Sequence, residues 1–106
     1  MQETLICGLS ATEIEQLKEE KGALVLIDVD YQGKKHQVIF REPSFKDMEA
    51  VNSISKSNEM KGLQAMYNNC IAIADSEVEK RDLLKIKAVE SLMTRVQKIS
   101  AEAKNL

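Results

Sequence analysis

The side chains that could take part in catalysis are few and scattered. The chain has one histidine, His36, and two cysteines, Cys7 and Cys70. A catalytic histidine needs a nucleophile within hydrogen-bonding distance, and the strand pattern around His36 places none beside it, so a half-buried structural histidine is favoured. Both cysteines stand among apolar residues and lack CxxC or Cys/His metal spacing, which predicts reduced, mostly buried thiols. We therefore expect no catalytic residue and no enzymatic activity.

A cluster of acidic residues is the other candidate for chemistry, because carboxylates bind divalent metals. It consists of Asp75, Glu77, Glu79 and Asp82. The spacing does not fit a calcium-binding loop, which also needs a glycine at its turn. Basic side chains between the acids can neutralise them, so a solvated surface is favoured over a metal site. The glycines are too scattered for a phosphate-binding loop. We expect no metal and no cofactor.

Length and charge limit the class of protein. The 106 residues suit one domain, and 15 basic against 17 acidic side chains give a net charge of −2. The two signs are interleaved, which argues against nucleic-acid binding. No stretch approaches the roughly 20 apolar residues of a membrane span, and the first residues lack the features of a signal peptide. We expect a cytoplasmic protein with no membrane or nucleic-acid partner.

Acidic side chains are concentrated in the first third of the chain. Residues 1–30 carry more acidic than basic groups. A segment of this kind is more often a solvated helix face than a docking surface for a basic partner. Ser10 and Glu13 have the spacing of a capping box, and Gly22 suits a helix stop, so we expect a short surface helix over residues 11–21.

Residues 38–48 mark a change from strand to helix periodicity and contain the only proline, Pro43. Proline fixes its own φ and favours an extended conformation for the residue before it, so a helix cannot begin earlier. Ser44 can then accept a hydrogen bond from the backbone N–H of Asp47 as an N-cap. The pattern predicts a strand that ends at this corner and a helix over residues 45–55.

Two β-rich runs before this corner predict a hairpin. The runs flank Gln32 and Gly33, which suit a two-residue loop. That loop places three cross-strand pairs on one face: Val25 with Phe40, Ile27 with Val38, and Val29 with His36. A slip by one residue would expose this apolar face, which supports the register. We expect the corner to place Phe45 and Met48 on the same face.

The remaining sequence is helical in pattern. We expect a charge-poor, buried helix over residues 59–74, and a final helical segment over 77–103 with a bend or break near 81–85. The predicted fold class is α+β and mostly α, with a small β-hairpin packed against a helical bundle. The single domain, 1–106, comprises an N-terminal helical segment (1–22), the hairpin (23–42) and the helical part (44–104).

Several methionines stand out in a chain with few aromatic residues. Flexible thioethers fill gaps in cores, which is the default reading, but they also adapt to varied partners. If the helices have more apolar surface than the hairpin can cover, the excess could form a groove for an amphipathic client helix. The candidate contacts for such a partner are Met60, Met66, Tyr67, Leu92, Met93 and Val96.

The segment Gln37-Val-Ile-Phe-Arg-Glu-Pro-Ser-Phe-Lys-Asp47 resembles the tail assembly chaperones of tailed bacteriophages and prophages. In that family a hairpin ends in an Arg-x-Pro step into a helix that starts with a small polar residue. The later order is also similar: a helix with Asn69-Cys70, an acidic turn over residues 75–79, and a closing helix. The resemblance covers about residues 23–104, and residues 1–22 lie outside it.

This resemblance implies a non-enzymatic activity, in which the chaperone keeps the helical tape measure protein soluble while the tail tube polymerises around it. The family pattern carries no catalytic residue to transfer. The alternative is a small structural or scaffold subunit of a phage-derived assembly, which would self-associate through the same helical faces and form a homo-oligomer.

Overall fold

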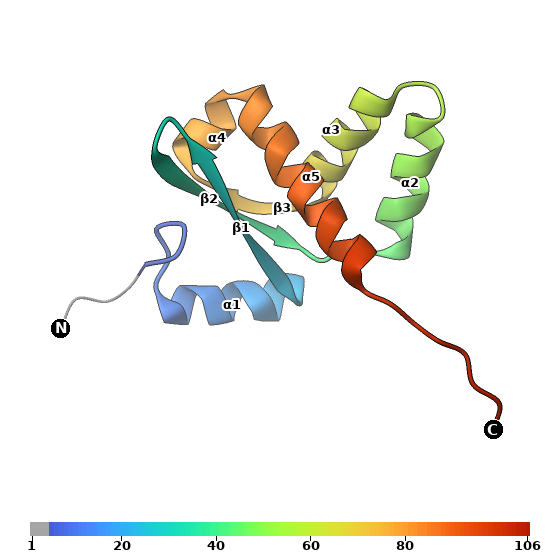
Figure 1. Cartoon of the computed structure of the whole chain (residues 1–106). Helices are drawn as coiled ribbons and strands as arrows, with labels where there is room; N and C mark the ends of the chain where they lie inside the picture. The colour runs from blue at the N-terminus through green and yellow to red at the C-terminus, as the bar shows by residue number, and fades with distance from the viewer. Residues whose placement is uncertain (1–4) are drawn as a thin grey trace.

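The computed structural model describes residues 5–106, which form a mostly helical α+β fold (Figure 1). The fold class predicted from the sequence is therefore confirmed. In chain order the elements are α1 (Ala11–Lys21), β1 (Leu24–Tyr31), β2 (Lys34–Arg41), α2 (Phe45–Ser55), α3 (Glu59–Cys70), β3 (Ile71–Ala74), α4 (Ser76–Lys80) and α5 (Asp82–Lys98). No helix in this part of the chain is long and apolar enough to cross a membrane.

The hairpin has the predicted register. Val25 lies opposite Phe40, and the pairing continues without a break from one end of β1 to the other. Gln32 and Gly33 form the loop with φ values of 52° and 78°. Two positive φ values are what a two-residue hairpin turn needs to follow the right-handed twist of its strands.

A third strand corrects the predicted end of the charge-poor helix. The helix stops at Cys70, and Ile71 turns to an extended conformation with φ −61° and ψ 129°. β3 then pairs antiparallel with β2, so the sheet order is β1-β2-β3. A short apolar run such as residues 71–74 fits a strand or a buried helix equally well by periodicity. Residues 71–74 form a strand here because the edge of β2 that is not paired with β1 offers them backbone hydrogen-bonding partners.

The final helical segment has the predicted break but ends earlier than expected. It is interrupted at Arg81, within the region where a bend was expected, and so gives α4 and α5. Arg81 itself is extended, with φ −127° and ψ 112°. α5 ends at Lys98 rather than near residue 103, because the residues after Ile99 are exposed and have no packing to hold another turn.

The core lies between the sheet and the later helices. Figure 1 shows α3, α4 and α5 on one side of the sheet and α1 on the other. The residues that are fully buried include Phe40, Val38, Met66, Val78, Val89 and Leu92. α2 packs against α3 closely enough that a Cβ atom at Gly62 would collide with the side chain of Ser55.

The N-terminal segment covers part of the opposite face of the sheet. The backbone N–H of Cys7 donates to Oε1 of Gln37 at 2.7 Å, and the Cys7 thiol donates to the carbonyl of Gln37 at 3.1 Å. α1 follows with the predicted capping box of Ser10 and Glu13, and it contains no buried residue. It is the surface helix that the sequence predicted.

An ion pair holds the corner between β2 and α2. Arg41 donates through Nη1 to Oδ2 of Asp47 at 2.6 Å and through Nη2 to Oδ1 at 2.9 Å. Nη2 also donates to the carbonyl of Asn69 at 2.7 Å, near the end of α3. The hydroxyl of Ser44 accepts from the N–H of Asp47, as predicted, and Asp47 returns the bond by accepting from the N–H of Ser44. One guanidinium therefore joins β2, α2 and α3.

The corner does not place α2 as the sequence predicted. Phe45 is 95% exposed, so its expected packing on the sheet is wrong. The cap fixes the first turn of α2, and the helix packs along α3 rather than across the strands. Met48 is partly buried against the core, while Val51 is buried.

Removing the Asp47 carboxylate is expected to destabilise the fold. In Asp47→Ala the guanidinium of Arg41 loses its carboxylate partner and stays partly buried. Removing one member of such an ion pair lowers the free energy of unfolding by about 3 kcal/mol. Urea denaturation at pH 7 measures this loss. Glu49→Ala, at an exposed position of α2, is the matched control and should change the free energy of unfolding by less than about 0.5 kcal/mol.

The same pair should make stability depend on pH. The hydrogen bonds from Arg41 hold the pKa of Asp47 well below its usual range. Because the folded pKa is lowered, the pair stabilises the protein fully above the unfolded pKa of about 3.9, and this contribution is lost as the pH falls below it. The stability difference between the wild type and Asp47→Asn should therefore shrink between pH 7 and pH 3. An unchanged difference would contradict this assignment.

Candidate partner-binding groove

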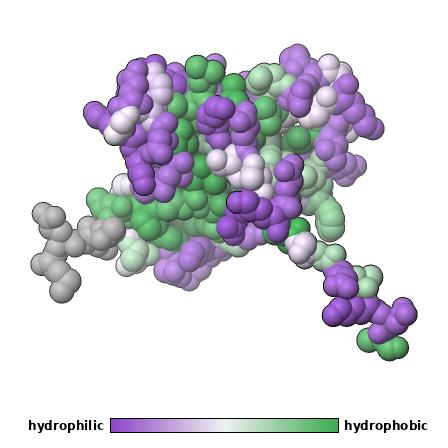
Figure 2. Space-filling view, viewed as in Figure 1, coloured by the Kyte–Doolittle hydropathy of each residue, from purple (hydrophilic) through white to green (hydrophobic). Residues whose placement is uncertain are grey.

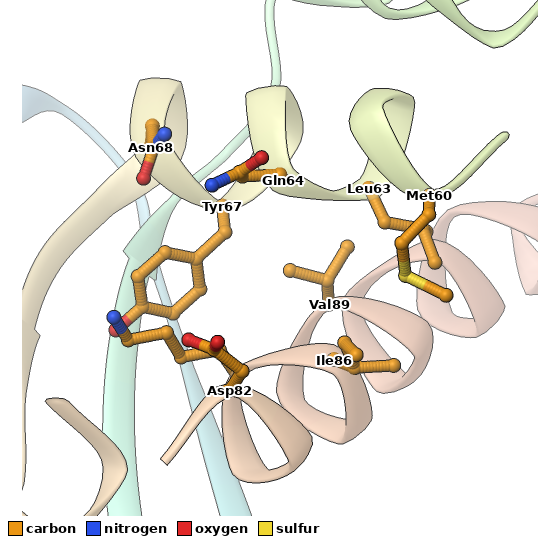
Figure 3. A pocket seen from close by; sticks show the side chains of 9 residues that line it. Met60, Leu63, Gln64, Tyr67, Asn68, Asp82, Ile86 and Val89 are labelled. Carbon is orange, nitrogen blue, oxygen red and sulfur yellow. The ribbon is translucent and has the colours of Figure 1, made fainter. Parts of the chain in front are cut away.

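A groove between α3 and α5 contains two of the predicted partner contacts. It has a volume of about 220 Å³ and is lined by Met60, Leu63, Gln64, Tyr67, Asn68, Asp82, Lys85, Ile86 and Val89. On each helix the lining residues recur at three- and four-residue spacing, which is the period of one helix face. The two faces lie opposite each other and form the walls (Figure 3).

The groove has an apolar end and a polar end. Figure 3 shows the apolar side chains toward the start of α3 and the polar ones toward its end: Met60, Leu63, Ile86 and Val89 at the first, and Tyr67, Asn68 and Asp82 at the second. Lys85 also belongs to the polar end, where its ammonium lies 5.5 Å from the centroid of the Tyr67 ring. At this distance the cation is attracted by the face of the ring.

Met60 and Tyr67 contribute differently to the groove. Met60 is 55% exposed, so its thioether is available to a partner without any rearrangement. Tyr67 is buried and packs edge to face on Phe40, with ring centroids 5.7 Å apart. Burial, with a further contribution from Glu79, raises the pKa of Tyr67, so its phenol keeps its proton at neutral pH. Tyr67 therefore forms a buried wall at the polar end, while Met60 is the exposed side chain at the apolar end, which is the mouth of the groove.

The other predicted contacts do not line this groove. Met66 and Leu92 have no exposed surface and belong to the core, so the expectation that they present a contact surface is wrong. Met93 and Val96 are partly buried elsewhere on α5. Helical spacing identifies apolar positions, but it does not say which of two neighbouring stripes packs on the sheet.

Three apolar lining residues were missing from the predicted set. They are Leu63, Ile86 and Val89. Leu63 lies four residues before Tyr67, and Ile86 lies three before Val89, so each shares a helix face with a lining residue. That spacing was visible in the sequence, but the pairing of the two faces across α3 and α5 was not.

The two cysteines, which were considered as possible nucleophiles, lie in environments that do not activate them. Cys70 is fully buried and its thiol donates to the sulfur of Met66 at 3.5 Å. Burial, followed by the charge of Asp47, raises the pKa of Cys70 to about 11. Cys7 is only partly buried, less than predicted, and burial and the nearby Asp75 raise its pKa too. Both thiols are free, and neither is activated as a nucleophile.

His36 lies opposite Val29 as predicted, but it is more buried than expected, at 8% exposed. Its Nδ1 is 3.4 Å from Oδ2 of Asp75. Asp75 caps α4 by accepting from the N–H of Glu77 at 2.8 Å, and Glu77 in turn pairs with Arg81. Within residues 5–106 no three His, Cys, Asp or Glu side chains are grouped so that they could hold a metal ion.

Comparisons with known proteins support the fold. No family model matches the chain, and no curated protein matches it. An uncharacterised protein from Bacillus stearothermophilus has a similar structure, with a TM-score of 0.62 and 18% sequence identity over 87% of this chain and 99% of the other. At this identity the likeness shows a shared fold and does not extend to function.

The two thiols should differ in reactivity. In the folded protein at pH 8 a thiol-specific reagent should modify Cys7 slowly and leave Cys70 unmodified, because Cys70 is fully buried and its raised pKa keeps it protonated. Mass spectrometry of the modified protein measures both sites. Cys7→Ser should abolish modification until a denaturant is added. Rapid modification of Cys70 in this variant would show that α3 opens or that the core is not packed as described.

Proposed function

We propose that this chain is a tail assembly chaperone: a non-enzymatic binding protein that holds an amphipathic helical client, the tape measure protein of a phage or prophage, soluble in the cytoplasm. The sequence resemblance at the corner, residues 37–47, supports the family. The groove between α3 and α5 supports a binding function and suggests where the client docks.

The observation that carries the proposal is the open apolar end of the groove. Met60 stands at its mouth with more than half of its surface exposed, above Leu63, Ile86 and Val89. The volume of about 220 Å³ is below the roughly 300–1,000 Å³ of most small-molecule pockets. It suits the insertion of a large apolar side chain from a partner, and a methionine at the mouth can adapt to different side chains along a helical client.

The polar end suits the flank of such a helix. Gln64 and Asn68 lie one turn apart on α3, and Asp82 and Lys85 face them from α5. These side chains offer both donors and acceptors, and charges of both signs. An amphipathic client could place an apolar anchor beside Met60 and its polar side chains over this end, as in other helix-in-groove complexes.

Self-association as a structural or scaffold subunit is the second candidate. Phe45 and Leu83 are large apolar side chains outside the groove, and they are 95% and 74% exposed. Burying them between copies would gain roughly 25 cal/mol per Å² of apolar surface removed from water. Light scattering distinguishes the two functions, since a scaffold subunit forms a large assembly of defined size without a client, whereas a chaperone forms a soluble complex only with one.

The client-binding role can be tested by co-expression with the tape measure protein of the same phage or prophage. The wild-type chain should raise the soluble fraction of that client, and Met60→Lys should reduce the rise severalfold, because it puts a charge at the apolar mouth. Lys and Met have similar helix propensities, so α3 should persist.

Leu83→Lys is the matched control, because Leu83 is an exposed apolar residue of α5 that does not line the groove. It should rescue the client as well as the wild type does. Equal loss in both variants, or no rescue by the wild type, would contradict the proposal.

A further inference from the structure

The outer edge of β1 is open. β1 has eight residues and pairs along its whole length with β2, while no strand within residues 5–106 pairs with its other side. Natural proteins usually protect such an edge with a proline, charged side chains, a bulge or a very short strand. β1 has eight residues and no proline, lysine or bulge, and its only charges, Asp28 and Asp30, lie on one face. The edge is therefore a ready template for another strand.

A second groove runs along this edge. It is about 910 Å³ in volume and lies between β1, over residues 25–30, and the α5 positions Lys87, Glu90, Ser91, Thr94, Arg95 and Lys98, with Ile99 beyond. Leu26 and Ile99 are 43% and 72% exposed there. Figure 2 shows apolar surface reaching the solvent over the sheet, between α1 and the later helices. This surface is separate from the groove between α3 and α5.

We propose that a second copy of the chain occupies this groove, with the two β1 strands paired antiparallel about a two-fold axis. Residues that lie opposite each other must point to the same face, so only registers that match the buried positions are allowed. Pairing about Asp28 would set the two Asp28 carboxylates against each other, which is unfavourable. Pairing about Ile27 sets each Asp28 against Leu26 of the second copy and avoids this repulsion.

The charges on α5 fit the same two-fold axis. In a two-fold dimer the two α5 helices run antiparallel on one side of the joined sheet. Among the lining residues, Ser91 and Thr94 are near the middle of the α5 set in chain order, and Ile27 is near the middle of the β1 set. The small side chains of Ser91 and Thr94 allow the two helices to approach. With Ser91 opposite Thr94 of the second copy, Glu90 lies opposite Arg95 on both sides. Arg95 forms no salt bridge within residues 5–106, so it is available for this pairing. Glu90 lies 3.5 Å from Nζ of Lys87 on its own helix, and this exposed pair must open or share the carboxylate when Arg95 of the second copy binds.

An extended peptide from another protein could use the same backbone hydrogen bonds, as in β-strand addition. Binding of such a peptide would not require that Glu90 and Arg95 of this chain have opposite charges. The reciprocal fit of these two residues is the reason to assign the groove to a second copy, and it is also the basis of the test.

A charge exchange tests the dimer. Sedimentation equilibrium of the full chain should give a monomer–dimer equilibrium. Glu90→Arg and Arg95→Glu should each raise the dissociation constant by about tenfold or more, because each sets like charges opposite each other twice. The double variant restores both pairs in reversed order and should return the constant to near the wild-type value. Both residues are exposed, and circular dichroism checks that α5 is intact.

A wild-type chain that stays monomeric up to about 1 mM would overturn the proposal and leave the edge to a peptide from another protein. A dimer that is insensitive to both single variants, or a double variant as weak as the single ones, would also overturn it. These results are independent of the client-binding test, since neither residue lines the groove that contains Met60.

Discussion

The bidentate pair between Arg41 and Asp47 is the interaction on which the arrangement of the other elements depends. Its two hydrogen bonds connect the end of β2 to the first turn of α2, and a third bond from Arg41 reaches the carbonyl of Asn69 in the last turn of α3. Asp47 is 6% exposed, and a carboxylate so buried is tolerated only when it is paired and hydrogen-bonded. Arginine suits this position because its planar fork presents several donors in fixed directions, which a lysine cannot do.

The position of α3 links this corner to both candidate surfaces. Because Arg41 binds the carbonyl of Asn69, α3 ends next to β2, and the residues that follow can pair with that strand as β3. Tyr67, one turn earlier, packs on Phe40 and forms the end wall of the α3–α5 groove. β3 also occupies one edge of β2, so β1 is left as an open edge beside α5. The ion pair thus holds in place the end of α3, which lies between the groove wall at Tyr67 and the start of β3.

The proposed function uses these surfaces separately. The α3–α5 groove is small and has the flexible side chain of Met60 exposed at its mouth, which fits the proposed binding of a helical client. The edge of β1 is unpaired, and the neighbouring α5 carries Glu90 and Arg95, whose opposite charges the proposed contact with a second copy would use. The buried thiol of Cys70 and the enclosed His36 lie in packed surroundings. Cys70 and His36 thus contribute to packing, while the α3–α5 groove and the edge of β1 are the surfaces accessible to a partner.

Much of the local structure was determined by the sequence alone. The hairpin register, the capping of α1 and α2 and the break near Arg81 follow from turn residues, caps and alternation, which act over a few neighbouring positions. The sequence did not determine β3, the exposure of Phe45, the burial of Met66 and Leu92, or the meeting of Met60 with Ile86. Each of these depends on which distant segment packs alongside, because hydrogen-bonding partners and buried faces are set by contacts between elements. Only the tertiary structure could therefore decide the core, the groove and the open edge.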